Sequence, residues 1–158
     1  MKIYIGADHA GFDLKNVLID FLTERGHEVT DRGAYTLDLE DDYPDFIIPV
    51  ARAVADGIAE RGIIIGGSGQ GEAITANRFA NVRAVVFNGQ YIPTDGRVAP
   101  NEIVLSREHN DANILSLGAR FLSIDEAKNA TLLWLETAFS GEERHVRRLK
   151  KMEEAVRM

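Results

Sequence analysis

Residues 62–72 read GIIIGGSGQGE, and this stretch decides the fold of the chain. The apolar run from Ile63 to Ile65 is short and β-branched, which predicts a buried strand over 62–65. Glycines follow this strand directly, and a segment with helical spacing comes next. A buried strand, a glycine-rich turn and a helix in immediate succession are typical of a parallel sheet covered by helices.

The same alternation extends from this stretch toward both ends of the chain. We predict strands over 2–7, 28–31, 62–65, 82–87 and 114–117. We predict helices over 12–25, from 43–44 onward, after the glycines of 66–71, after a capping box formed by Ser123 and Glu126, and from 142 onward. Five short parallel strands with helices between them predict a small, doubly wound α/β sheet.

Length and composition restrict the class of protein. The chain has 158 residues, which is enough for one domain with its own core, and we predict a single domain over 1–158. A hydrophobic fraction of 45% beside 27% charged residues excludes a disordered or coiled-coil chain.

Charge and residue usage exclude several kinds of partner. The net charge of −7 argues against nucleic acid and anionic membranes as partners. No apolar run approaches the roughly 20 residues of a membrane span, and the first residues lack the apolar core of a secretory signal, so we expect a cytoplasmic protein. The chain contains no cysteine, which excludes disulfides, thiolate metal ligands and a thiol base.

Two polar motifs directly follow predicted strands, where ligands of open α/β sheets bind. The first is DHAG at 8–11; Asp8 can cap the turn and His9 can be an exposed turn residue, so this motif alone leaves a structural and a functional role equally open. The second is the glycine loop, which satisfies neither GxGxxG nor the Walker pattern, because Glu72 stands where a P-loop has lysine. Backbone amides beside one carboxylate suit proton abstraction next to a carbonyl, although Glu72 also suits a helix N-terminus structurally.

Two further groups of residues are candidates for a site. His109 stands in the polar cluster SREHND at 106–111, and this setting favours a functional role over a structural one. Arg144 and Arg148 are four residues apart on the last predicted helix, so both guanidinium groups can meet one anion. From the spacing alone, a solvated basic helix is the better interpretation of this pair.

Taken together, these motifs resemble the ribose-5-phosphate isomerase B family, the RpiB/LacAB sugar-phosphate isomerases. The resemblance covers nearly the whole chain. It is carried by DHAG at 8–11, DDYP at 41–44, GGSGQGEAITANR at 66–78, SREHND at 106–111, GAR at 118–120 and RHVRR at 144–148.

The resemblance implies a fold, a reaction and an assembly. The fold is a Rossmann-like three-layer α/β/α sandwich with a five-stranded parallel sheet. The reaction is the interconversion of ribose 5-phosphate and ribulose 5-phosphate through a cis-enediolate, with neither a cofactor nor a metal. The assembly is a homodimer, or a tetramer built from it, in which the C-terminal helix lies at the interface and each active site draws on both subunits.

The resemblance also implies roles for individual residues. One branch of the family uses a cysteine at the position of Gly66 as its base, and the absence of cysteine selects the branch in which Glu72 is the base. Ser68 and the amides of the glycine loop would stabilise the enediolate, and His109 would open the furanose ring. The implied substrate-binding residues are Asp8, His9, Tyr43, Gly67, Gly69, Gly71, Asn110, Arg120, Arg144 and Arg148, the three arginines holding the phosphate.

Three alternatives to this interpretation are kept. The loop over 88–103 is longer than the family pattern, and the first alternative is that it selects a tetrose, hexose or modified pentose phosphate instead; Tyr91, Asp95 and Arg97 are its candidate contacts. A sugar-phosphate binding module without catalysis would need neither Glu72 nor His109. A nucleotide-binding protein is disfavoured by the two failed motifs.

Overall fold

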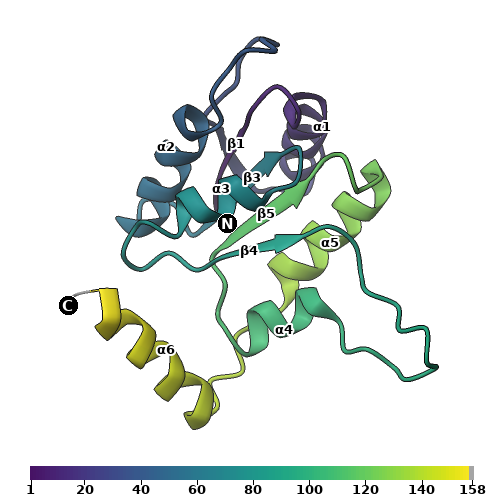
Figure 1. Cartoon of the computed structure of the whole chain (residues 1–158). Coiled ribbons are helices and arrows are strands. Elements are labelled where there is room, and N and C mark those ends of the chain that lie inside the picture. Colours follow the sequence, from purple (N-terminus) through teal and green to yellow (C-terminus); the bar gives the residue numbers. More distant parts are fainter. Residues whose placement is uncertain (157–158) are drawn as a thin grey trace.

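The computed structural model describes residues 1–156, which form a five-stranded sheet between two layers of helices (Figure 1). The strands are β1 (Lys2–Ala7), β2 (Glu28–Asp31), β3 (Arg61–Gly66), β4 (Ala84–Phe87) and β5 (Ile114–Gly118). The helices are α1 (Phe12–Thr23), α2 (Pro44–Ala55), α3 (Gln70–Ala76), α4 (Glu102–Glu108), α5 (Ile124–Glu136) and α6 (Glu143–Val156). All strand pairs are parallel, in the order β2-β1-β3-β5-β4, which confirms the predicted Rossmann-like α/β/α sandwich.

The central strand β3 explains why the sheet is covered on both faces. Successive side chains of a strand point to opposite faces. Ile63 and Ile65 therefore join the core beneath α1, α4 and α5, whereas Ile64 joins the core beneath α2 and α3. All three side chains are fully buried, and each contributes about 1.5–3 kcal/mol of hydrophobic free energy.

The predicted element boundaries hold to within a few residues. The strand predicted over 82–87 begins two residues later, because the N–H of Val82 is used in a turn and donates to the carbonyl of Phe79. The helix predicted over 12–25 ends at Thr23. The capping box of Ser123 and Glu126 is present with both of its hydrogen bonds.

Two segments lie outside the compact layers. Helix α6 extends away from them (Figure 1, yellow), and Glu153 ties it back through an ion pair with Arg83, 3.0 Å between Nη1 and Oε1. The loop after β4 ends at Asn101, which caps α4, rather than at 103. Gln90 closes the base of this loop: its side chain donates to the carbonyl of Pro100 and accepts the N–H of Glu102.

Residues 157–158, included in the predicted domain, lie outside the described part of the chain. Among the helices of residues 1–156, none combines the length and the apolar character that crossing a membrane requires.

Candidate active site

The strand order creates a crevice between β1 and β3. After β1 the chain turns to one face of the sheet through α1, and after β3 it turns to the other face through α3. Such a switch point is where α/β sheets bind their ligands. A pocket of about 340 Å³ opens there; it is lined by Asp8, His9, Ala10, Tyr43, Gly67, Ser68, Gly71, Glu72, Arg120 and Phe121.

Glu72 lies in the first turn of α3, and only 4% of its surface is exposed. Its carboxylate folds back toward the end of β3, into the space that a side chain at Gly66 would fill. Burial raises the pKa of Glu72, and the negative charge of Asp8 raises it further, against an opposing hydrogen bond from the backbone N–H of Glu72 itself. A carboxylate with a raised pKa is a stronger base than an exposed one.

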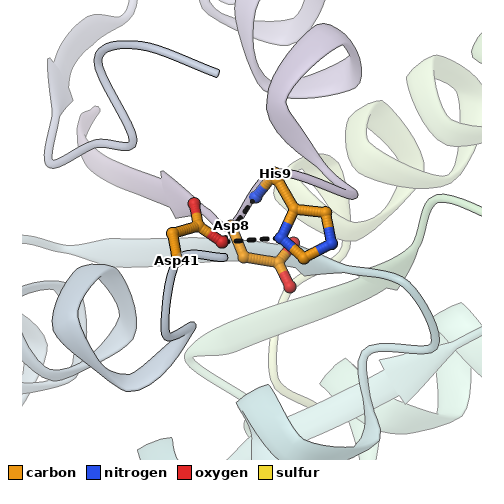
Figure 2. Close-up of side chains that lie close together, drawn as sticks. All are labelled: Asp8, His9 and Asp41. Carbon is orange, nitrogen blue, oxygen red and sulfur yellow. Dashed lines mark hydrogen bonds and ion pairs between the residues drawn. The ribbon is translucent and has the colours of Figure 1, made fainter. Parts of the chain in front are cut away.

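Asp8 and His9 follow β1 and face the same pocket. Asp8 Oδ1 accepts the backbone N–H groups of Ala10 (3.0 Å) and Gly11 (3.1 Å), so this oxygen holds the turn into α1. The His9 ring is held by Asp41, with 2.6 Å between Nδ1 and Oδ1 (Figure 2). This hydrogen bond raises the pKa of His9, and the charge of Asp8 adds to it, whereas burial and Arg120 oppose the shift.

The same three side chains are the place to test for a metal ion. Among residues 1–156, Asp8, His9 and Asp41 form the one group of metal-ligating side chains whose ligand atoms lie within 4.8 Å of one another. The 2.6 Å separation of Nδ1 and Oδ1 is that of a charge-assisted hydrogen bond, so a proton joins His9 to Asp41. We therefore assign no metal to this group.

The remaining pocket residues pack closely on the glycine loop. The Arg120 guanidinium lies over Gly67, and the Tyr43 ring lies over Gly71; a β-carbon on either glycine would come within about 3 Å of these groups. Ser68 Oγ accepts the N–H of Gln70. Gly69 stands behind the pocket, where its carbonyl accepts the hydroxyl of Ser116 at 2.7 Å.

Four predicted site residues lie elsewhere in the chain, so one copy does not assemble the whole predicted site. His109 ends α4 and stacks on the buried ring of His145, with ring centroids 4.2 Å apart. Asn110 lines hollows beside β4. Arg144 and Arg148 are exposed on α6, where Arg144 pairs with Glu142 at 2.8 Å. The loop residues Tyr91, Asp95 and Arg97 are also absent from the described pocket lining, and Arg97 pairs with Asp95 on the exposed loop.

Sequence reasoning missed two residues of the pocket lining, Ala10 and Phe121, and also Asp41, which holds His9 from outside the lining. Asp41 belongs to the DDYP motif, but only Tyr43 of that motif was predicted to be functional; a carboxylate two residues before a predicted site tyrosine was the available signal. Phe121 directly follows Arg120 and lines the pocket while remaining exposed. No periodicity marks an apolar residue in a turn as part of a pocket.

The fold and the pocket define an α/β protein whose ligand crevice holds a buried carboxylate, a glycine loop and nearby cations, an arrangement that can move a proton beside a carbonyl of a small anionic molecule. The family model of ribose/galactose isomerases (LacAB/RpiB) matches residues 3–152. The chain belongs to this family, as the resemblance of its motifs implied.

Individual relatives agree with this assignment. Ribose-5-phosphate isomerase B of Escherichia coli is 40% identical over 149 residues, which covers 94% of this chain and 92% of the relative. Ribose-5-phosphate isomerase B of Clostridium thermocellum superposes with a TM-score of 0.89 at 43% identity, covering 99% of this chain and 98% of that one. Ribose-5-phosphate isomerase B of Mycoplasma genitalium, solved with bound ribulose 5-phosphate, superposes with a TM-score of 0.88 at 31% identity. The match covers 98% of this chain and 95% of that one.

Proposed function

We propose that this chain is an aldose–ketose isomerase that interconverts ribose 5-phosphate and ribulose 5-phosphate. The observation that carries the proposal is the buried carboxylate of Glu72 beside the glycine loop, in a family with relatives named ribose-5-phosphate isomerase B, one of them solved with bound ribulose 5-phosphate. A sugar-phosphate binding module would not need a buried base with a raised pKa. Tyr91, Asp95 and Arg97 of the long loop are absent from the described pocket lining, so within one chain they give no support to a substrate of another length.

The proposed chemistry begins with the open-chain aldehyde. Glu72 removes the proton from C2, the electron pair forms the C1–C2 double bond of the enediolate, and the negative charge moves to the C1 oxygen. Ser68 and the amides of the glycine loop stabilise this oxygen, where one well-placed donor is worth about 3–4 kcal/mol. The hydroxyl proton on the C2 oxygen then moves to the C1 oxygen, protonated Glu72 returns its proton to C1, and the C2 carbonyl of the ketose forms. Proton and electron pair stay within one substrate molecule, so the step needs no redox partner.

Ring opening and phosphate binding are proposed to use a second copy of the chain. His109 would protonate the ring oxygen, and Arg144 and Arg148 would hold the phosphate together with Arg120 of the pocket. The first three residues lie outside the pocket of their own chain, which supports a homodimer whose active sites each combine two subunits. A cytoplasmic location stays a prediction.

The test of the base is Glu72→Gln, which keeps the shape of the side chain and removes its basicity. We expect kcat for ribose 5-phosphate to fall about 10²- to 10⁴-fold, the usual contribution of a general base, while KM changes little. Glu24→Gln, at an exposed position next to the end of α1, is the matched control and should be fully active. A Glu72→Gln variant with unchanged turnover would refute the mechanism.

The shared site has its own test, because two inactive variants can complement each other. In mixed dimers, Glu72→Gln and His109→Asn subunits combine one intact Glu72 with one intact His109. Refolding the two variants together at equal amounts should restore about a quarter of the wild-type activity, since half of the dimers carry one complete site. No recovery would mean that each site is built within one chain. Turnover of four-, five- and six-carbon phosphates by the wild type separates the pentose from the other substrates.

A further inference from the structure

We propose that Asp41 is a positioning residue of this active site: it holds Nδ1 of His9 so that Nε2 faces the pocket and donates a hydrogen bond to an anionic oxygen of the substrate. The inference rests on the proposed function for the identity of the substrate. It adds a residue that lines no part of the pocket itself.

The geometry fixes the orientation of the His9 ring. Asp41 Oδ1 accepts from ring Nδ1 of His9 at 2.6 Å and from the backbone N–H of His9 at 3.1 Å, so one oxygen holds both the ring and the backbone of this residue (Figure 2). Only 8% of the Asp41 side chain is exposed, against 26% for His9. Since Nδ1 is turned to the buried carboxylate, the exposed part of the ring is the edge that carries Nε2.

Among the described residues, His9 is the one group with which the charge of Asp41 pairs. The second oxygen of Asp41, Oδ2, is buried and lacks a hydrogen-bond partner there. An asparagine could accept the same two hydrogen bonds without the cost of burying a negative charge. That cost is offset where the carboxylate faces a cation, and the imidazolium form of His9 is the group that it touches.

The surroundings of His9 favour an anion as its ligand. Arg120 is close enough to affect the pKa of His9 and lines the same pocket, so two cations share one opening. The opposing charges are Asp8, next to His9, and Glu72, across the pocket. Asp41 raises the pKa of His9 and so extends the cationic form to higher pH. Binding of an anion should therefore weaken as the pH rises through the pKa of His9.

The test compares Asp41→Asn with the wild type, because asparagine keeps the acceptor and removes the charge. NMR titration of the His9 ring should show a lower pKa in Asp41→Asn. KM for ribose 5-phosphate at pH 8 should rise about tenfold while kcat stays within about threefold, and the rise of KM with pH should begin at lower pH. Glu40→Gln, which removes an exposed charge from the same loop, should change neither.

A double-mutant cycle separates an action through His9 from a structural role. In a His9→Asn background, Asp41→Asn should leave KM unchanged, whereas loss of loop structure would raise KM equally in both backgrounds and overturn the proposal. An unchanged His9 titration in Asp41→Asn would overturn it as well. The titration, repeated with inorganic phosphate as the anion, does not depend on turnover. If the chain has no isomerase activity, the proposed function is refuted, but the phosphate titration still tells whether Asp41 acts through His9.

Discussion

Replacing Gly66 with alanine should disable the active site through one added methyl group. Gly66 ends β3 with its backbone outside the left-handed region, so alanine fits the local backbone. The new β-carbon, however, would fall on the carboxylate of Glu72, overlapping Cδ and Oε1 and lying 2.9 Å from Oε2. The side chain of Glu72 must then move away.

The size of the effect follows from this displacement. Carbon and oxygen atoms in contact need about 3.4 Å or more, so the carboxylate has to shift by about 1 Å at least. A misplacement of about 1 Å in a reacting group costs on the order of 10²-fold in rate, or about 2.7 kcal/mol in the barrier. We expect kcat of Gly66→Ala to fall by this factor, whereas KM, which depends on the cations of the pocket, changes little.

Steady-state isomerisation of ribose 5-phosphate, followed with the melting temperature of each variant, measures this effect. The matched control places Gly66→Ala in a Glu72→Ala background, where the space is vacant and the added methyl group should change neither activity nor stability further. Wild-type kcat in the single variant would refute the reasoning, because the carboxylate could not then occupy the position described. An equal loss of stability in both backgrounds would point to the backbone instead.

Three further predictions concern pH and stability. Because the pKa of Glu72 is raised above 4.5, kcat should begin to decline on acidification at a higher pH than an ordinary carboxylate would cause; a pH profile that is flat down to 4.5 would contradict this. Ser123→Ala removes the cap of α5 and should lower the free energy of unfolding by about 1 kcal/mol in urea titrations, with kcat unchanged. Asp31→Ala leaves the fully buried ammonium of Lys15 without its 2.6 Å partner and should cost about 3 kcal/mol, whereas Asp31→Asn should cost less.

Much of the fold could be predicted because each element carries a local signal. The strand at 62–65 is apolar and β-branched, and a capping box in the sequence marks the start of the helix at 124–136. The start of β4 could not be predicted. Val82 is a residue type that favours strands, but its N–H donates to the carbonyl of Phe79 in a turn and so is not available to the sheet. Local residue preference does not reveal which neighbour uses a backbone hydrogen bond.

The site was predictable in part for a related reason. Residues that follow β1 and β3 meet at the switch point, so topology alone brings Asp8 and Glu72 to one pocket. The predicted site residues His109 and Arg144 lie apart from this pocket within one chain, and no pattern along a single sequence says whether a second copy would bring them to it. Asp41 escaped prediction because its role depends on a contact with His9, 32 residues earlier in the chain.

The loop between β4 and α4 offers a practical attachment point. Gln90 bridges the two ends of the loop, so residues 91–99 are joined to the fold by a closed base, and Ile92 and Val98 within this segment are 80% and 94% exposed. A fluorophore or affinity tag inserted between Ile92 and Val98 would contact neither the sheet nor the glycine loop. This loop is therefore a suitable site for labelling. Shortening it to Gln90 is a direct way to make a smaller version of the protein.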